Sequence, residues 1–518
     1  MSEYDEIPYG GVAAPLSHPA RLALAARFQG VAAADPRACR VLELGCAEGA
    51  NLLPMAFHLE GSELVGVDAS AAHIARAEEA RDRLGLDNLS FVHADLREVE
   101  LEGEFDYVIA HGVLSWVAED VRARILALAQ RHLTPNGALF LSYNCAAGWA
   151  SKAPLRRVLL SRAAGAPPAE RASRVREVLA HVAGSPLRES SPHAAALAAQ
   201  AASALQHRDA YLVHEYLSEH HHAFDQRELR ALAEAHGLAF LTELAPASNV
   251  AGLEDDLLGT LAPRFGEDAD DLADVLLGRA FRSSVFVREG VERERSLDRA
   301  LEGVVFRGRL APSDSRFSLE PDVAETFRTA SGAQISVRSA PLKAALVEIG
   351  RAWPRGLDLA GLLSRATLQL QVRRALAPES QLDDAARAGL VTDLLELGRL
   401  GHLELRLGDP DVAREPPEAP RVSALTRLEA ERDGYVTSPH HEVVPLAPFA
   451  RELVRALDGS RDREALTARL REAVEAGGLA AEGPGGEPLS TEALARALPA
   501  LVERTIAELT AAGLILPG

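Results

Sequence analysis

The segment VLELGCAEGANLLPMA (residues 41–56) decides the fold, because it joins a buried apolar run to a helical run through a glycine-rich turn. Two similar apolar runs follow, ELVGVD (63–68) and LSFVHAD (89–95), and each of them ends on an aspartate. Short apolar runs without polar alternation are typical of buried parallel strands, and helical spacers between them make β–α–β units. The pattern continues to Asn144 and predicts a doubly wound, Rossmann-like α/β sheet.

The residues that end these strands should meet in one crevice, because ligands of such sheets bind outside the carboxyl ends of the strands. Asp68 follows Gly45 by 23 residues, a spacing suited to a carboxylate that holds a ribose diol. Glu43 lies two residues before Gly45, where it would repel a pyrophosphate but balance the ammonium and sulfonium groups of S-adenosylmethionine. Asp95 would accept the adenine amine, and the Leu96 amide would meet a ring nitrogen. The turn therefore predicts S-adenosylmethionine as the cofactor.

The composition is that of an ordinary folded protein, with 47% hydrophobic and 25% charged residues. Asp and Glu outnumber Lys and Arg by 75 to 55 in the 518 residues, and the net charge of -20 disfavours nucleic acid as a partner. Cys39, Cys46 and Cys145 are too few for a disulfide framework. The start of the chain lacks an apolar signal, and no apolar run reaches the roughly 18 residues of a membrane span. We expect a cytoplasmic protein without stable membrane insertion.

Residues 151–207 differ from their surroundings, because they are rich in alanine and hold eight Lys or Arg against three acidic residues. This composition predicts a helical insertion in the α/β domain. The insertion is a candidate homodimer interface or a docking site for an acidic substrate, although solvated helix faces explain its charge as well. The helical and apolar runs of residues 208–290 are expected to complete the sheet.

The last part of the chain contains an internal repeat, over residues 339–407 and 442–516. Each copy has two helical runs joined by a turn, and then a third that leads into a terminal apolar strand. This order predicts two winged-helix-like α+β units. Because residues 331–518 hold 22 Lys or Arg against 27 Asp or Glu, we expect docking or scaffolding rather than DNA binding. The expected organisation is a cofactor-binding core at 1–150, the insertion at 151–207, the region at 208–290, a connecting segment at 291–330, and winged-helix-like units at 331–410 and 423–518.

The chain resembles the class I S-adenosylmethionine-dependent methyltransferases, and among them the bacterial group with a methyltransferase regulatory domain. That group includes the rickettsial protein-lysine methyltransferases of outer-membrane proteins. The resemblance runs almost the full length and rests on the glycine turn together with YDEIPY (4–9), SHPARL (17–22), HGVLSWV (111–117), LTPNGALFLSYN (133–144), GW (148–149) and YLVHEYL (211–217). It implies methyl transfer to a protein amine such as that of lysine.

The resemblance and the strand ends together define an expected site. Tyr4, Tyr9 and His18 are expected to fold over the cofactor as a lid. The residues expected to bind S-adenosylmethionine are Tyr9, His18, Glu43, Gly45, Cys46, Ala47, Gly49, Asn51, Asp68, Ala69, Asp95, Leu96, His111, Gly112 and Ser115.

The acceptor should lie at the ends of the fourth and fifth strands, and its lone pair must be held about 3 Å from the transferred methyl group. Tyr143 and Asn144 are the first candidates, because they close the fifth strand. The faces of Trp116 and Trp149 would hold a methylated ammonium by cation–π attraction, although packing explains both tryptophans equally well.

Two features keep other functions open. Ala47 stands where the family usually has a second loop glycine, and its methyl group restricts φ. A non-catalytic interaction protein on a methyltransferase scaffold is therefore one alternative, and a small-molecule methyltransferase is another.

The run His220, His221 and His222 with Asp225 suggests metal ligands, but adjacent histidines cannot all face one ion in regular structure, so we expect no metal.

Overall fold

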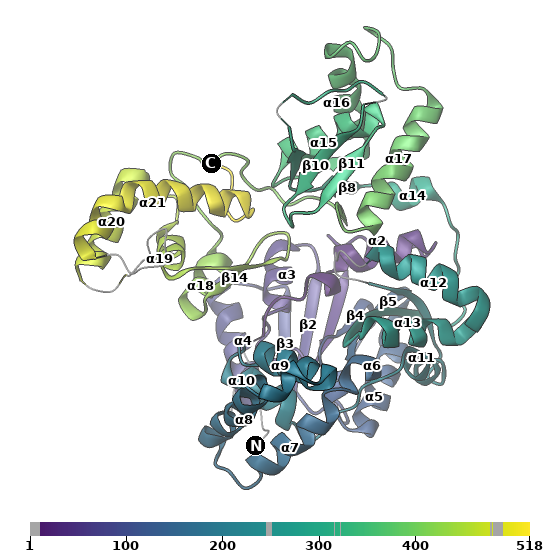
Figure 1. Ribbon diagram of the computed structural model, residues 1–518, viewed down its shortest axis with the longest axis vertical. Coiled ribbons are helices and arrows are strands. Elements are labelled where there is room, and N and C mark those ends of the chain that lie inside the picture. Colours follow the sequence, from purple (N-terminus) through teal and green to yellow (C-terminus); the bar gives the residue numbers. More distant parts are fainter. Residues whose placement is uncertain (1–10, 245–250, 315, 322, 477–478, 480–489) are drawn as a thin grey trace. The chain divides into compact units, whose positions relative to one another are not determined.

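A seven-stranded sheet carries the part of the chain from Arg40 to Arg288 (Figure 1). The computed structural model describes residues 11–518 except 245–250, 315, 322, 477–478 and 480–489. The strand order is β3-β2-β1-β4-β5-β7-β6, with β1 to β5 parallel and β7 antiparallel to both of its neighbours. The predicted Rossmann-like sheet is confirmed. Its strands are β1 (Arg40–Leu44), β2 (Glu63–Asp68), β3 (Leu89–His93), β4 (Phe105–Ala110), β5 (Leu133–Asn144), β6 (Leu238–Glu243) and β7 (Phe281–Arg288).

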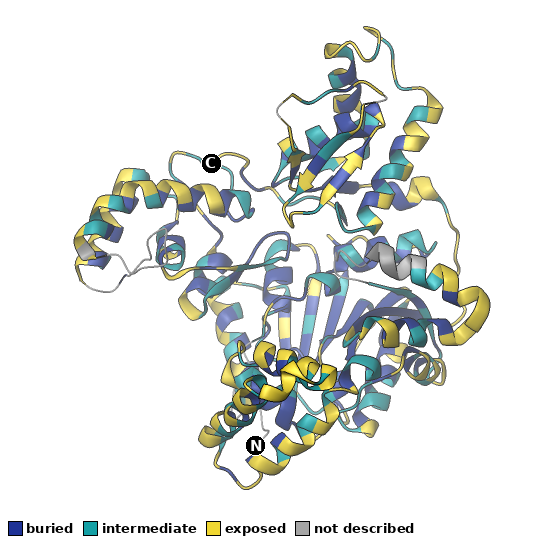
Figure 2. Ribbon diagram, in the orientation of Figure 1, coloured by how far each residue is buried: buried dark blue, intermediate teal, exposed yellow. Residues whose placement is uncertain are grey.

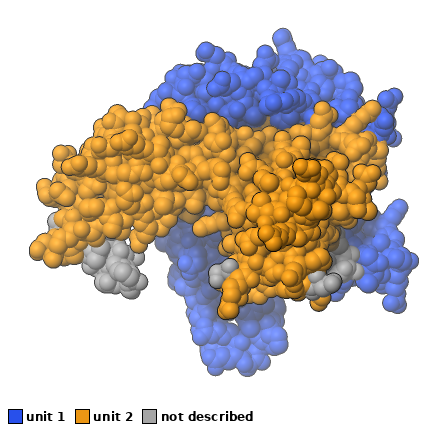
Figure 3. All heavy atoms as spheres, turned by 90° about the horizontal axis from the view of Figure 1, so that it is seen from above, with its two compact units in different colours: residues 1–12, 25–245, 254–294 blue, residues 13–24, 246–253, 295–518 orange. Residues whose placement is uncertain are grey.

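The chain forms two compact units (Figure 3). Unit 1 comprises residues 1–12, 25–245 and 254–294, and unit 2 comprises residues 13–24, 246–253 and 295–518. The central strands of unit 1 are almost wholly buried (Figure 2). In the part of the chain that the structure describes, no helix is both long and apolar enough to cross a bilayer.

The helices between the strands begin and end at recognisable signals. The Ser70 hydroxyl accepts a hydrogen bond from the His73 N–H at 3.2 Å and caps α4, which ends at Gly85 with φ 64°. Because Ser70 follows β2 directly, this cap also fixes the chain at the end of that strand. The helices of this part are η1 (Pro15–Ser17), α2 (Pro19–Phe28), α3 (Leu52–His58), α4 (Ala71–Leu84), η2 (Leu114–Trp116), α5 (Glu119–His132), α6 (Ala146–Trp149), α11 (Gln226–Glu234), α12 (Ala251–Phe265), η4 (Gly266–Asp268) and α13 (Ala269–Leu277).

The segment after β5 is helical and has a small core of its own. Leu159, Val175, Leu179, Leu212 and Val213 are buried together in it. A proline stands in the first turn of α7, α8 and α9, where its missing N–H costs nothing. These helices are α7 (Ala153–Ala163), α8 (Pro168–Ala183), η3 (Pro186–Glu189), α9 (Pro192–Ala204) and α10 (Asp209–Leu217).

Unit 2 contains both copies of the internal repeat. β12 and β13, which lie in the first copy, pair with the two edges of β8, which precedes that copy, and a second sheet has the order β11-β10-β9. The elements before and in the first copy are α14 (Leu297–Leu301), β8 (Val304–Arg307), β9 (Leu310–Pro312), β10 (Glu325–Thr329), β11 (Gln334–Val337), α15 (Ala340–Ala352), β12 (Leu357–Asp358), α16 (Leu359–Val372), α17 (Asp384–Arg399) and β13 (Glu404–Leu407). Those after the first copy are α18 (Ala424–Arg432), β14 (Tyr435–Thr437), β15 (Val443–Pro445), α19 (Pro448–Ala456), α20 (Arg463–Glu475) and α21 (Thr491–Ala511).

The predicted terminal strand is present in the first copy as β13, but the prediction is wrong for the second. After α21 the chain bonds to an irregular segment instead of a strand edge. The Ala413 N–H donates to the Ile515 carbonyl at 2.8 Å, and the Leu516 N–H donates to the Arg421 carbonyl at 2.9 Å. These isolated bonds fix the chain end but form no continuous ladder.

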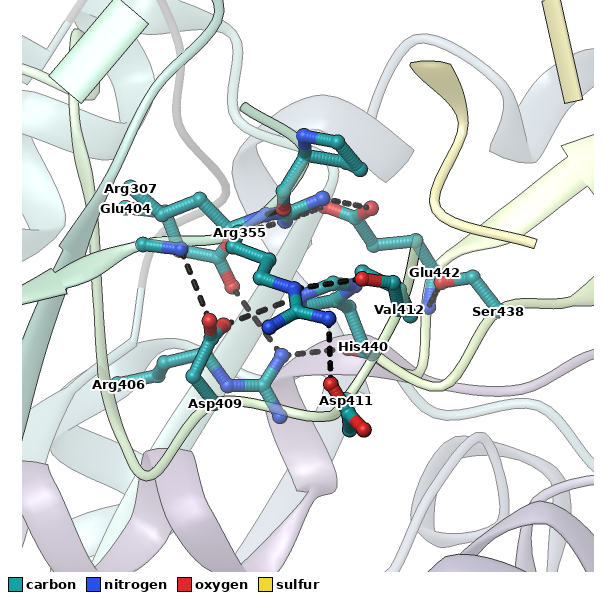
Figure 4. A network of polar contacts seen from close by, with 12 residues as sticks. Arg307, Arg355, Glu404, Arg406, Asp409, Asp411, Val412, Ser438, His440 and Glu442 are labelled. Atoms are coloured by element: carbon teal, nitrogen blue, oxygen red, sulfur yellow. Dashed lines mark hydrogen bonds and ion pairs between the residues drawn. The ribbon is translucent and has the colours of Figure 1, made fainter. Parts of the chain in front are cut away.

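A buried charge cluster joins the two repeats within unit 2 (Figure 4). The Arg307 side chain, on β8, is 0% exposed and binds Glu404 on β13 and Glu442 from the second repeat. Its guanidinium carbon also lies 4.3 Å from the ring centroid of Trp353. Burial alone would raise the pKa of Glu404, but the nearby arginines, with Arg21 and Arg307 foremost, lower it to about 2. The carboxylate of Glu404 is therefore ionised, and its ion pairs fix the position of the Arg307 side chain.

Arg307→Met should destabilise unit 2, because it leaves Glu404 and Glu442 without their shared cation. The expected loss in free energy of unfolding is about 1–3 kcal/mol, because Glu404 keeps Arg21 at 2.7 Å and the Glu442 side chain is 38% exposed. Hydrogen exchange of the β8 and β13 amides measures it. Arg496→Met, which removes an exposed pair with Glu492, is the control and should change exchange in its own region by under about 0.5 kcal/mol. Unchanged exchange in Arg307→Met would contradict the role given to the cluster.

Candidate active site

The turn after β1 is shaped by two glycines in the left-handed region, Gly45 with φ +80° and Gly49 with φ +74°. A Cβ at Gly45 would lie 2.4 Å from Val113 Cγ2, and one at Gly49 would lie 2.8 Å from a phenylalanine ring carbon. The N–H groups of Gly45 and Cys46 donate to the Val67 carbonyl at 2.8 and 3.1 Å. The turn is therefore tied to β2 and stays close to the sheet edge.

Ala47 keeps the turn conformation without a glycine, with φ +46°. Its N–H donates to Asp68 Oδ2 at 2.9 Å, while Asp68 Oδ1 accepts the Ser70 N–H at 2.9 Å. A left-handed backbone costs an L-residue about 1–2 kcal/mol, and this hydrogen bond offsets part of that cost. Each carboxylate oxygen has two lone pairs, so Asp68 can hold the turn and still accept a ribose hydroxyl.

Glu43, on β1, is a buried carboxylate with one oxygen satisfied. Its Oε1 accepts a hydrogen bond from Asn51 Nδ2 at 2.9 Å, and its Oε2 has no partner among the described residues. Burial raises the pKa of Glu43 to about 7, with a further contribution from Asp68. An unpartnered buried carboxylate oxygen is costly by itself, and a cationic ligand would satisfy it.

The turn after β3 places two more predicted residues, and the end of β2 places a third. Asp95 Oδ1 accepts the Arg97 N–H at 2.9 Å, which fixes the turn and leaves the carboxylate partly exposed. Leu96 is buried, and Ala69, which follows β2, is exposed. The Asp95 carboxylate is therefore accessible to a ligand, whereas the Leu96 side chain belongs to the core.

The end of β4 is joined to β5 by side-chain hydrogen bonds. Ser142 Oγ accepts the Gly112 N–H at 2.8 Å and lies 2.8 Å from His111 Nδ1. Burial lowers the pKa of His111 to about 4, so its ring is neutral at physiological pH. Ser115 Oγ accepts the Asn144 N–H at 2.9 Å. The fourth and fifth strand ends are thus held together.

Of the three residues predicted to form a lid, the structure describes His18 alone. Tyr4 and Tyr9 lie outside the described residues. His18 belongs to unit 2, where its ring centroid lies 5.0 Å from that of His441 and its Nδ1 accepts the Ala20 N–H at 3.1 Å. The lid formed by these residues stays a prediction.

The other side of the site is an aromatic wall, defined here as Trp116, Trp149 and His221 together with Asn144. The His221 ring centroid lies 4.1 Å from that of Trp149 and 4.9 Å from that of Trp116. Asn144 Nδ2 lies 3.3 Å from His221 Nε2. Burial, with help from nearby cations, lowers the pKa of His221 to about 4. The aromatic wall is therefore made of neutral groups.

Tyr143 lies on the opposite face of the sheet from Asn144, although both were predicted to face the acceptor. Its hydroxyl lies 3.0 Å from Ser284 Oγ, and its ring packs in the core at 5.9 Å from that of Phe224. Side chains alternate along a strand, so neighbours such as these cannot both face one layer. The structure brings Asn144 to the aromatic wall and leaves Tyr143 in the core.

Two residues at the site had no role assigned from the sequence. His221 was considered only as a metal ligand, and its position near two tryptophans depends on contacts between segments far apart in the chain. Phe281, 46% exposed, begins β7 opposite Asn144, and its ring centroid lies 6.4 Å from that of His111. In the sequence Phe281 is only an aromatic residue at the start of an apolar run. That pattern does not predict which strand pairs with it, so its position opposite Asn144 could not be predicted.

Three family profiles match this chain. Residues 41–137 match a profile described as Methyltransferase domain. Residues 208–288 match Predicted methyltransferase regulatory domain, and residues 418–514 match PKMT, C-terminal winged helix domain. This chain is a methyltransferase. The matched segments include the glycine turn and Asp68, and they extend to the second copy of the internal repeat.

The relatives of this methyltransferase agree with the profiles. Uncharacterized protein RP789 of Rickettsia prowazekii is 24% identical over 96% of this chain and 91% of its own. The trans-aconitate 2-methyltransferase of Deinococcus radiodurans is 33% identical, but over 19% of this chain and 36% of its own. The structure of PKMT2 from Rickettsia typhi covers 98% of this chain and 100% of its own at 20% identity, with a TM-score of 0.82. The same protein in complex with AdoHcy gives a TM-score of 0.79 at 19% identity. The predicted family, fold class and S-adenosylmethionine-dependent activity are confirmed.

The Glu43 carboxylate indicates that the site can bind S-adenosylmethionine, because its Oε2 has no hydrogen-bond partner among the described residues. Glu43 Oε2 would meet the cationic amino-acid end, and Asp68 would accept the ribose hydroxyls. When bound, the cofactor supplies a methyl group activated by a sulfonium. Metal ligation is not supported in the same way, because the described residues hold no group of three His, Cys, Asp or Glu that could bind an ion.

Ala47→Gly should stabilise the methyltransferase, because glycine adopts φ +46° without the steric cost. The gain in free energy of unfolding should be at most about 1 kcal/mol, since glycine also has the larger entropy when unfolded. Urea denaturation of the full chain measures it. Ala75→Gly, on the exposed face of α4, is the matched control and should lose about 1 kcal/mol. Equal losses in both variants would show that position 47 is not strained.

Cofactor affinity should rise with pH as Glu43 ionises. The pKa of Glu43 is raised to about 7 in the free protein, so below that pH a cationic ligand must displace a proton to bind. Titration calorimetry at pH 6 to 8, in buffers of different ionisation heat, should show proton release that fades above pH 7. Glu43→Gln should abolish both the release and the pH dependence. Proton release that persists in Glu43→Gln would assign the proton to another group.

Proposed function

We propose that this methyltransferase transfers the methyl group of S-adenosylmethionine to the side-chain amine of a lysine in a protein. The observation that carries the proposal is the aromatic wall at the end of β5, with Asn144 as its polar member. The match to a PKMT winged helix domain and the likeness to PKMT2 support a protein as the substrate.

An amine acceptor needs a lone pair, and the wall offers the environment that favours one. Neutral His221 and the two tryptophans desolvate a bound amine, which disfavours its charged form. The Asn144 side-chain oxygen is an acceptor for an amine N–H and would aim the lone pair. After transfer, the face of Trp116, which is only partly buried, attracts the methylated ammonium, while the buried Trp149 supports the wall from behind.

The alternatives fit the observations less well. A non-catalytic scaffold was suggested by Ala47, yet this residue keeps the left-handed turn and its bond to Asp68. A small-molecule acceptor finds support in the trans-aconitate 2-methyltransferase relative, but that likeness covers 19% of the chain. A protein acceptor also gives the regulatory and winged-helix domains a role in docking. A homodimer through the helical insertion, the absence of nucleic acid and a cytoplasmic location stay predictions.

Mass spectrometry of a bacterial proteome incubated with this methyltransferase and isotope-labelled S-adenosylmethionine tests the proposal. Labelled methyl groups should be found on lysine Nζ atoms. Asp68→Ala should remove both cofactor binding and the label, because the glycine turn and the ribose lose the same carboxylate. Label confined to small metabolites would overturn the proposal, as would a label that persists in Asp68→Ala.

Trp116→Ala tests the aromatic wall separately from the cofactor. With a lysine peptide as acceptor, kcat/KM should fall about tenfold, the equivalent of one lost cation–π contact. Cofactor affinity, measured by calorimetry, should stay unchanged. Trp116→Phe keeps an aromatic face and should remain within about threefold of the native value. A parallel loss of cofactor affinity in Trp116→Ala would place this residue on the cofactor side instead.

A further inference from the structure

Lys152 and Lys343 are the only lysines in a chain that otherwise uses arginine for its positive charge. Lys343 is buried, and its Nζ donates to the carbonyl oxygens of Glu320 and Val323. Lys152 instead lies at the aromatic wall, with its Nζ 4.5 Å from the ring centroid of Trp149. One ammonium group therefore stands next to the place proposed for the acceptor.

A second cation lies on the same side of the wall. Arg156, one helical turn along from Lys152 on α7, donates from Nη2 to the Ser218 carbonyl. Ser218 begins the segment that leads to His221, and its hydroxyl donates to the His220 carbonyl at 3.1 Å. Arg156 thus holds this segment while keeping its own charge near His221.

The carboxylates near the wall are engaged by other groups. Glu215, on α10, lies 3.7 Å from Lys152 Nζ, and Glu228 lies 2.7 Å from His222 Nε2. Burial raises the pKa of Glu215, and Lys152 acts against that rise. Beyond burial, the charges of Arg156 and Lys152 lower the pKa of His221 further. Lys152 offsets the charge of Glu215, so Lys152, Arg156 and Glu215 together carry one net positive charge beside the wall.

We propose that Lys152 and Arg156 are electrostatic positioning residues that keep the bound acceptor amine neutral. The inference rests on the proposed function, because it requires an amine at the aromatic wall. Free lysine has a pKa of about 10.4, so only about one amine in 2500 is neutral at pH 7. A unit charge about 10 Å away in a protein-like dielectric shifts such a pKa by about one unit. Each cation then increases the neutral fraction of the bound amine about tenfold.

Lys152 and Arg156 take no part in the bonds that form and break during methyl transfer. The amine releases its proton to solvent on binding. Its lone pair then forms the nitrogen–carbon bond while the carbon–sulfur bond breaks, and S-adenosylhomocysteine leaves. Lys152 and Arg156 neither gain nor lose a proton, so their effect is confined to the charge state of the bound acceptor.

The pH dependence of kcat for Lys152→Gln tests this role, because kcat reports the ionisation of the bound complex. The probe is a synthetic peptide with one lysine, taken from a site found in the labelled proteome. The pKa in the kcat profile should rise by about one unit, so kcat at pH 7 falls about tenfold and recovers at higher pH. KM should fall in parallel, because the protonated peptide binds better without the repelling charge, and kcat/KM should change little.

Matched variants separate charge from structure. Lys152→Arg keeps the charge and should retain the native profile, while Arg157→Gln removes an exposed cation from the same helix and should leave the profile unchanged. The pKa of His221, followed by NMR, should rise in Lys152→Gln even without acceptor. Lys152→Met serves if the glutamine variant does not fold.

Two outcomes overturn the inference: a lower kcat/KM with an unmoved profile, or an unchanged His221 pKa in Lys152→Gln. Either result leaves the proposed function intact if the native enzyme still methylates the peptide. Absence of lysine methylation by the native enzyme would instead overturn the proposed function.

Discussion

The aromatic wall, which we propose as the acceptor side, depends on the hydrogen bonds that fix the end of β5. The Cys145 N–H donates to the Ala280 carbonyl, and the Gly148 N–H donates to the Arg279 carbonyl at 2.8 Å. A Cβ at Gly148 would lie 2.6 Å from Ala280 Cα, so only glycine permits this approach of two backbones. From the other side, the Phe224 N–H donates to the Asn144 carbonyl. The short helix that carries Trp149 therefore has a fixed position.

The residues expected on the cofactor side follow from local sequence. Gly45, Ala47, Asp68 and Asp95 each act within a few residues of a strand end, and parallel strands bring their carboxyl ends to one edge. Once the strands were assigned, the position of these residues required no knowledge of distant contacts. The departure at Ala47 was also visible in the sequence, although the hydrogen bond that supports it was not.

The acceptor side depends on contacts between distant segments, and there the sequence was a weaker guide. Tyr143 and Asn144 end the same strand, and only the register with β7 shows which of them faces the core. His221 reaches the tryptophans because its segment bonds to Ser115 and Asn144, which lie far from it in the chain. The prediction of a terminal strand in the second repeat was wrong for a similar reason. A strand forms only where another strand is available to pair with it, and the sequence of the repeat does not show whether one is.

The two sides of the site carry opposite charge, and this division suits a reaction that moves positive charge from sulfur to nitrogen. Glu43 and Asp68 are placed to meet a cationic cofactor, whereas Lys152 and Arg156 lie near the neutral aromatic wall. A protonated amine would bring a full charge into this positive region, while the transition state brings only part of one to nitrogen. The field therefore disfavours the unreactive complex more than the reacting one. A tryptophan face offsets part of the charge that nitrogen gains in the transition state, while the same positive region favours release of the methylated ammonium after transfer.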